Sequence, residues 1–268
     1  MELDSLALAA QQKIYFASDF HLGIPSVEAS RDRERKIVRW LEEAAKDADH
    51  IFLLGDVFDF WFEYRKAVPR GFTRLLGKLA ELSDAGISLY MFTGNHDIWM
   101  WDYFPTELQI PVFHKPLSFT VGQHRFHVGH GDGLGPGDHT FKAMKKVFRN
   151  PLFQWLYARL HPNLGLAVGQ RASYSSRLAK EIEPEDMAFF GKQEWLVQYC
   201  EQMQQSQPHD FYVFGHRHLP MDLPIGAGAR YLNLGEWVHQ CTYAVYDGES
   251  LQLKAFEQPL PELSAFEE

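Results

Sequence analysis

Five short polar clusters in this sequence bring together carboxylate, amide and imidazole groups, the side chains that bind transition-metal ions. Each cluster follows a run of apolar residues. In chain order the clusters are Asp19-Phe20-His21, Gly55-Asp56-Val57-Phe58-Asp59, Gly94-Asn95-His96-Asp97, Gly129-His130-Gly131-Asp132 and Gly215-His216-Arg217-His218. A single cluster of this kind arises by chance in many proteins, and a lone histidine is more often a structural residue than a ligand. Five clusters, each after a β-rich run, predict a metal centre.

The apolar runs before the clusters are short and rich in β-branched and aromatic residues, which favours buried strands. They cover residues 13–18, 50–54, 88–93, 125–129 and 210–214. Two stretches with helical periodicity, 31–48 and 71–86, separate the first three runs. This alternation predicts right-handed crossovers and a largely parallel sheet at first. Because loops at the carboxyl ends of such strands converge, we expect the clusters in one crevice.

Two carboxylates, one amide and four imidazoles would meet in that crevice, which is a ligand set for two transition-metal ions. They belong to Asp19, Asp56, Asn95, His21, His130, His216 and His218. In Asp19-x-His21 and His216-x-His218 the ligands lie two residues apart, so an extended segment would direct both to one side. A glycine precedes four of the ligands, and we expect it to permit a tight turn where the strand ends.

The pattern changes after residue 105. Residues 118–130 predict a β-hairpin that turns at Gly122-Gln123, and residues 240–256 predict another that turns at Asp247-Gly248. Residues 138 to about 205 have helical character throughout and interrupt the series of strands. We therefore expect an α/β fold with a catalytic core formed by 1–134 and 206–268 and a helical cap inserted at 135–205.

Composition narrows the class of protein. The chain has 268 residues, of which 46% are hydrophobic and 23% charged, so it can build a packed core. The net charge of −9 argues against nucleic-acid binding by the whole surface. Cys200 and Cys241 lack metal-site spacing and are expected to be reduced, in the cytoplasm. Neither a signal peptide nor a membrane span is predicted, so any membrane contact is expected to be peripheral.

The ordered motifs D-x-H, G-D-x-x-D, G-N-H-D, G-H-G-D and G-H-x-H resemble those of the calcineurin-like metallophosphoesterases. The resemblance implies two packed mixed β-sheets flanked by helices. It implies a first metal held by Asp19, His21, Asp56 and His218, and a second held by Asp56, Asn95, His130 and His216. Asp56 would bridge them. Two divalent ions roughly 3.5–4 Å apart clamp a phosphoryl group and lower the pKa of a shared water.

The same resemblance gives roles to the residues of the third cluster. Asn95 would touch the phosphate as well as a metal, and His96 would stabilise developing charge or protonate the leaving oxygen. Asp97 would orient His96, or alternatively cap its own loop. Asp59 of the second cluster is expected to steady a metal-ligating histidine, as carboxylates beside such histidines commonly do.

The predicted cap has an unusual charge pattern. Residues 139–180 contain eight Lys or Arg residues and no Asp or Glu: Lys142, Lys145, Lys146, Arg149, Arg159, Arg171, Arg177 and Lys180. Aromatic and aliphatic residues lie between them. A basic, apolar helical segment beside a phosphoesterase site favours an anionic amphiphile or an anionic membrane surface as the partner. The alternative is a cap whose apolar face packs on the core and whose charges are only solvated.

Within the family, the sequence is similar to the UDP-2,3-diacylglucosamine hydrolases of lipid A synthesis. That similarity rests on the SDFHLG start, the G-D-x-F-x-x-W stretch from Gly55 to Trp61, and the position of the basic cap. It implies cleavage of the pyrophosphate to UMP and the lipid monophosphate, with Mn²⁺ as the metal, although iron and zinc also suit the ligands. Asp138, Phe141 and Arg171 would lie near the sugar diphosphate. The enzyme would be cytoplasmic and peripherally associated with the inner membrane, and no protein partner is evident.

One position departs from that group, whose best-known members have arginine where this chain has His96. An arginine binds phosphate oxygens through two parallel hydrogen bonds, whereas a histidine can donate a proton. His96 therefore leaves open two alternatives: a variant hydrolase of this group, or a phosphodiesterase or phosphatase acting on another, soluble phosphoester. A non-enzymatic scaffold on the same fold is a separate alternative.

Overall fold

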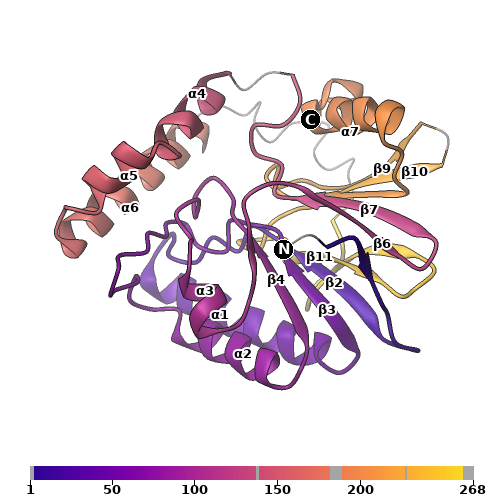
Figure 1. Ribbon diagram of the computed structural model, residues 1–268, viewed down its shortest axis with the longest axis horizontal. Coiled ribbons are helices and arrows are strands. Elements are labelled where there is room, and N and C mark those ends of the chain that lie inside the picture. Colours follow the sequence, from indigo (N-terminus) through magenta and orange to yellow (C-terminus); the bar gives the residue numbers. More distant parts are fainter. Residues whose placement is uncertain (1–2, 137–138, 182–188, 227, 262–268) are drawn as a thin grey trace.

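The computed structural model describes residues 3–136, 139–181, 189–226 and 228–261. For residues 139–141, 174–181 and 192 it describes the backbone alone. Two six-stranded sheets form the centre of the molecule (Figure 1).

The first sheet contains the strands predicted at the start of the chain. Its order is β12-β11-β2-β3-β4-β5. Strands β2 to β5 are parallel, β11 pairs antiparallel with β2, and β12 pairs antiparallel with β11. The strands are β2 (Lys13–Ala17), β3 (Ala48–Leu53), β4 (Ser88–Phe92), β5 (Val112–Phe113), β11 (Thr242–Tyr246) and β12 (Leu251–Ala255). The hairpin predicted at 240–256 is confirmed as β11–β12.

The second sheet has the order β1-β6-β7-β8-β10-β9. Its strands are β1 (Ser5–Leu6), β6 (Leu117–Val121), β7 (His124–Gly129), β8 (Phe211–Phe214), β9 (Pro220–Ile225) and β10 (Ala229–Leu234). The hairpin predicted at 118–130 is confirmed as β6–β7, and β7 runs parallel to β8. Strand β9 was not predicted. It carries Pro220 and Pro224, which lack ladder donors, and it lies at the sheet edge, where proline is tolerated.

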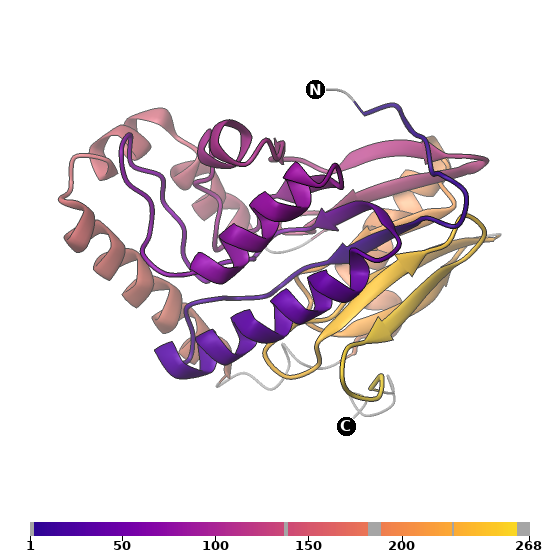
Figure 2. The same cartoon turned by 90° about the horizontal axis from the view of Figure 1, so that it is seen from below.

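The two sheets face each other and are covered by helices on their outer sides, which gives the predicted αββα arrangement (Figures 1 and 2). Helices α1 (Val27–Ala44) and α2 (Thr73–Asp84) cover the first sheet. The alternation of side chains in β2 explains both contacts. Ile14 and Phe16 pack between the sheets, whereas Tyr15 and Ala17 pack under the helices. Burial of each large apolar side chain contributes roughly 1.5–3 kcal/mol.

Helix α7 (Trp195–Ser206) covers the second sheet through Leu196, Val197 and Cys200. It therefore forms the fourth layer of the sandwich, although it falls within the range 135–205 predicted for the cap. The boundaries of the cap stay a prediction.

The helices α4 (His139–Phe148), α5 (Pro151–Tyr157) and α6 (Pro162–Glu181) extend beyond the sandwich at one side (Figure 1). The short α3 (Tyr103–Glu107) and the 3₁₀ helix η2 (Gly191–Gln193) complete the elements of the described residues. In that part of the chain, every helix is too short or too polar to cross a lipid bilayer. Phe148, Phe153 and Tyr157 of the cap pack on Phe62 and Trp99 of the core, and this contact joins the cap to the loops that follow β3 and β4.

Candidate metal centre

The carboxyl ends of β2, β3, β4, β7 and β8 lie at one edge of the sandwich, and each is followed by one of the predicted clusters. Asp19, Asp56 and Asn95 come from the first sheet. His130 and His216 come from the second. The convergence that the sequence predicts is therefore present in the structure.

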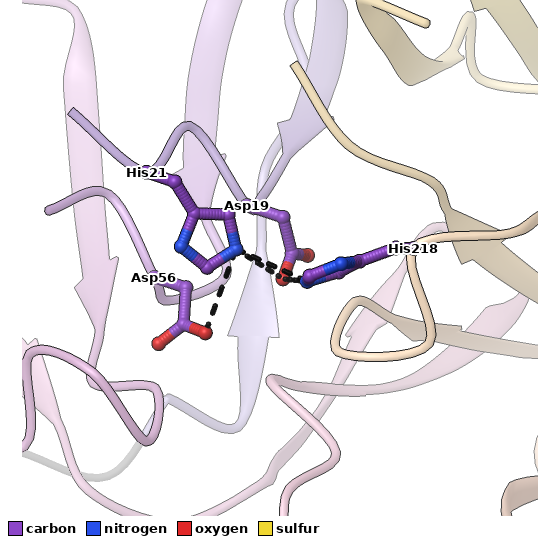
Figure 3. A group of neighbouring side chains, drawn as sticks. All are labelled: Asp19, His21, Asp56 and His218. Carbon is purple, nitrogen blue, oxygen red and sulfur yellow. Dashed lines mark hydrogen bonds and ion pairs between the residues drawn. The ribbon is translucent and has the colours of Figure 1, made fainter. Parts of the chain in front are cut away.

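Asp19, His21, Asp56 and His218 form a compact group in which one ligand atom from each residue lies within 4.8 Å of the others (Figure 3). The Nε2 atoms of His21 and His218 are 3.0 Å apart. Oδ1 of Asp19 lies 3.1 Å from Nε2 of His218 and 3.6 Å from Nε2 of His21. Oδ2 of Asp56 lies 3.8 Å from Nε2 of His21. These are the residues that the family resemblance assigns to the first metal.

The second half of the site lies on the other side of Asp56. Nε2 of His130 is 3.4 Å from Oδ2 of Asp56 and 3.2 Å from Oδ1 of Asn95. Nδ1 of His130 is 2.9 Å from the carbonyl oxygen of Leu54, to which it can donate, and this contact turns Nε2 toward the site. The rings of His130 and His216 are 5.1 Å apart. Oδ2 of Asp56 thus faces histidines of both halves, as a bridging carboxylate must.

The backbone at the predicted ligands differs from the expectation of extended segments. Five of them have left-handed φ angles: Asp19 (55°), His21 (45°), Asp56 (51°), His216 (72°) and His218 (57°). The prediction that D-x-H and H-x-H are extended is therefore wrong. Non-glycine residues adopt this conformation at a cost of about 1–3 kcal/mol each, and such strain concentrates at functional sites.

Two glycines show why this edge tolerates no larger residue. Gly55 has a φ of +92°, which supports the predicted turn before Asp56. Gly94 has no positive φ and is needed for space, because a Cβ atom there would collide with the carboxylate and backbone nitrogen of Asp56. The glycine before Asn95 therefore serves close approach between β3 and β4 rather than a turn.

Burial and charge at the site fit divalent cations. Asp19, His21 and Asp56 are almost fully buried, and within the described residues Oδ1 of Asp19 accepts no hydrogen bond. Burial acts to raise the pKa of Asp56, but the neighbouring His130 and His96 outweigh it and hold that pKa well below its usual value. Burial acts to lower the pKa of His130, and Asp56 outweighs it and raises the pKa to about 10. Charged carboxylates in a buried site with oxygen and imidazole donors suit Mn²⁺, iron or zinc.

His96 lies at the margin of this centre and contacts both the core and the cap. Its Nδ1 atom is 3.1 Å from the backbone carbonyl oxygen of Asp59 and 2.8 Å from Oγ of Ser173 in α6. Ser173 Oγ also donates to Oδ2 of Asp59 at 2.7 Å. Oδ1 of Asp59 lies 3.8 Å from Nδ1 of His21, beside the histidine that it was predicted to steady. No spacing or motif pointed to Ser173, which is one of several serines in the basic segment.

Asp97 is fully buried below this loop and caps it. Oδ1 accepts hydrogen bonds from the backbone amides of Gly94 (2.7 Å) and Asp56 (3.3 Å). Oδ2 accepts from Val57 (2.8 Å) and Phe58 (3.3 Å). Burial and the nearby Asp56 raise the pKa of Asp97 to about 7. These contacts favour the loop-capping alternative, and the orienting role stays a prediction.

An ion pair that was not predicted supports the last cluster. Arg217, between His216 and His218, forms two hydrogen bonds with Glu194: Nε to Oε2 at 2.8 Å and Nη2 to Oε1 at 3.0 Å. Both side chains are buried. An arginine between two ligands could have indicated a buried acidic partner. No local sequence pattern, however, identifies that partner as Glu194, which lies just before α7.

Of the three cap residues predicted to bind substrate, the structure describes the side chain of Arg171 alone. Asp138 lies outside the described residues, as does the side chain of Phe141, whose backbone belongs to α4. Arg171 is exposed and lines a cavity of about 510 Å³ together with Asp59 and Phe60. Lys145 of α4 pairs with the buried Asp132 of the core, whereas Lys142 of α4 donates to the carbonyl oxygen of Gly135 at the start of the predicted cap.

The model of the calcineurin-like phosphoesterase family matches residues 12–220, which include every predicted metal ligand. The chain belongs to the calcineurin-like phosphoesterase family. This membership, together with the hydrolases among the curated relatives below, confirms the prediction of a metal-dependent hydrolase.

Two of the curated relatives of this chain are both named UDP-2,3-diacylglucosamine hydrolase. A UDP-2,3-diacylglucosamine hydrolase from Porphyromonas gingivalis is 40% identical over 92% of this chain and 98% of its own length. A UDP-2,3-diacylglucosamine hydrolase from Pseudomonas fluorescens is 26% identical over 91% of this chain and 95% of its own length. Among solved structures, the phosphoesterase YfcE from E. coli matches 92% of this chain and 94% of its own, with 16% identity and a TM-score of 0.46.

Proposed function

We propose that this protein hydrolyses the pyrophosphate of UDP-2,3-diacylglucosamine to UMP and 2,3-diacylglucosamine 1-phosphate in the lipid A pathway. The observation that carries the proposal is the 40% identity to a hydrolase of that name over almost the whole of both chains. The alignment with this hydrolase spans the cap as well as the core, and the cap is the segment that we expect to select the substrate.

The geometry of the site is suited to this reaction. When bound, two divalent ions supply charge stabilisation for the phosphoryl group and an activated water. Asp56 faces both halves of the site, and Asn95 lies beside His130, within reach of a phosphate oxygen. His96 is held at Nδ1 by Asp59 and Ser173, and in our proposal Nε2 exchanges a proton with the leaving oxygen.

We further propose Mn²⁺ as the metal. The donor set combines carboxylate and amide oxygens with imidazole nitrogens and contains no thiolate, a composition that manganese accepts. The residues that would hold the first ion are Asp19, His21, Asp56 and His218, and those for the second are Asp56, Asn95, His130 and His216.

The cap supports a proposed peripheral contact with the anionic, cytoplasmic face of the inner membrane. Leu152, Trp155 and Leu156 of α5 are all more than half exposed. The guanidinium of Arg159 lies 4.6 Å from the centre of the Trp155 ring, which places a cation beside the apolar group. Exposed apolar side chains next to basic ones are typical of surfaces that enter the lipid interface.

The test is release of UMP from UDP-2,3-diacylglucosamine in the presence of Mn²⁺ and detergent, with an aryl phosphodiester as the control substrate. Rapid UMP release with little aryl turnover would support the proposal. Turnover of the aryl ester alone would retain the metal-dependent mechanism and overturn the lipid substrate, in favour of a soluble phosphoester.

A further inference from the structure

The hydroxyl of Ser173 lies between two groups of the catalytic core, although it belongs to the cap. Its Oγ is 2.8 Å from Nδ1 of His96, 2.7 Å from Oδ2 of Asp59 and 2.9 Å from the backbone carbonyl oxygen of Asp59. These partners are 77 and 114 residues away in the sequence. Ser173 is therefore a contact through which the cap touches the predicted catalytic histidine directly.

The donors and acceptors at this contact fix the direction of its hydrogen bonds. The carbonyl oxygen of Asp59 can only accept, so Nδ1 of His96 carries the proton when it bonds there at 3.1 Å. The single hydroxyl proton of Ser173 can go to the Asp59 carboxylate at 2.7 Å or to the Asp59 carbonyl oxygen at 2.9 Å, and either choice leaves Oγ to accept from Nδ1–H of His96. With Nδ1 protonated and held, Nε2 is the nitrogen that exchanges a proton with a substrate.

The position of Ser173 depends on how α6 packs on the core. Gly165, Gly169 and Ser173 are spaced four residues apart and share one face of the helix. A Cβ atom at Gly169 would collide with the ring of Phe60, and one at Gly165 would collide with the hydroxyl of Tyr64. Close approach at the two glycines therefore brings the next turn of α6, with Ser173, to His96.

We propose that Ser173 is a positioning residue, whose hydroxyl holds the His96 ring and the Asp59 carboxylate in the geometry for proton transfer when the cap is docked. The proposal rests on the proposed function, because it assigns His96 a part in that reaction. It predicts an effect on the chemical step and little effect on substrate binding.

The test compares four variants with the Mn²⁺-loaded wild-type enzyme: Ser173→Ala, Ser173→Thr, His96→Ala and the double variant Ser173→Ala/His96→Ala. Ser206→Ala is the matched control, because Ser206 is an exposed helical serine of α7 whose Oγ donates to the carbonyl oxygens of Gln202 and Met203 in its own helix. We expect Ser173→Ala to lower kcat about 5- to 50-fold, with KM within twofold and metal content unchanged. Ser173→Thr, which keeps the hydroxyl, should recover most of the loss.

The double variant decides between positioning and general structural support. If Ser173 acts through His96, the double variant should be no slower than His96→Ala, because coupled residues are not additive. Additive losses, an equal kcat for Ser173→Ala and wild type, or an unchanged kcat with a raised KM would each overturn the proposal. The cycle is run on UDP-2,3-diacylglucosamine and on the aryl phosphodiester, so failure of the lipid substrate is distinguishable from failure of the Ser173 proposal.

Discussion

Nε2 of His21 and Nε2 of His218 lie 3.0 Å apart, although 197 residues separate them in the sequence. Two imidazole nitrogens at this distance, with the buried carboxylates of Asp19 and Asp56 beside them, form a site that a divalent cation completes.

Replacement of the carboxylate shared by both halves should abolish metal-dependent turnover. Asp56→Asn removes a negative charge that faces His21 and His130, so we expect loss of bound metal and at least a hundredfold fall in kcat/KM. Metal content and turnover are measured together. Removal of metal from wild type with a chelator should lower Tm, since an ion at 100 times its Kd stabilises the folded state by about 2.7 kcal/mol. Full activity of metal-free protein would contradict the assignment.

The buried pair between Arg217 and Glu194 should contribute to stability far more than an exposed pair. Glu194→Ala leaves the Arg217 charge buried without its carboxylate, which typically costs about 3–5 kcal/mol. The matched control is Asp222→Ala, which breaks the exposed pair with Arg230 and should cost about 1 kcal/mol or less. Urea unfolding gives both values. Equal costs would show that the buried pair has no special role in holding the loop with His216 and His218.

Alanine at two helical glycines should have opposite effects. At Gly77 of α2 an added Cβ atom meets no atom within 4 Å, so Gly77→Ala should stabilise the protein by about 0.5–1 kcal/mol. At Gly169 of α6 the added atom collides with the Phe60 ring, so Gly169→Ala should displace the helix. We expect Gly169→Ala to lower the free energy of unfolding and, like Ser173→Ala, to lower kcat. A stabilised, fully active Gly169→Ala variant would exclude close packing of α6 in solution.

The free energy of unfolding should fall as the pH is lowered, because the buried His127 resists protonation in the folded protein. Burial lowers the pKa of His127 to about 4, with a smaller effect from His209. The unfolded chain therefore takes up a proton below about pH 6.5, where the folded protein does not. The stabilising contribution is complete above that pH and is lost as the pH falls toward 4, by about 3 kcal/mol at most. His127→Gln should flatten the slope of unfolding free energy against pH between about pH 6.5 and 4.

The exposed apolar residues of α5 should govern contact with membranes. Replacement of Leu152, Trp155 and Leu156 with serine should weaken binding to anionic vesicles at least tenfold, because each removes apolar surface available to the lipid interface. Val27 of α1 is comparably exposed at 58%, and Val27→Ser is the control expected to bind as wild type. Co-sedimentation with vesicles measures both. Undiminished binding of the triple variant at low salt would remove α5 from the contact.

The sequence predicted the five strands before the clusters, the two hairpins and helices α1 and α2, because the strands are short apolar runs and the helices have a clear period. It also predicted which residues converge, since parallel strands end at a common edge. Ser173 and Glu194 could not be found in this way. Their contacts depend on where α6 and the segment before α7 pack, and no local spacing relates them to His96 or Arg217.

Some errors have a local physical cause. Strand β9 was not predicted; it carries Pro220 and Pro224, and the edge position that permits them is known only from the sheet order. The D-x-H and H-x-H segments were expected to be extended because alternate side chains of a strand share one face. The left-handed angles at Asp19, His21, His216 and His218 bring their side chains together by a different route.

The predicted ligands divide between the two sheets: Asp19, His21, Asp56 and Asn95 follow strands of one, and His130, His216 and His218 follow strands of the other. Bound ions would therefore link the two halves of the sandwich at the edge where their strands end. Loaded protein should open these strand ends as one cooperative unit, and amides near the ends of β2 and β8 should exchange with solvent at similar free energies. In metal-free protein, the ends of β2 and β8 should open independently, and their amides should exchange faster.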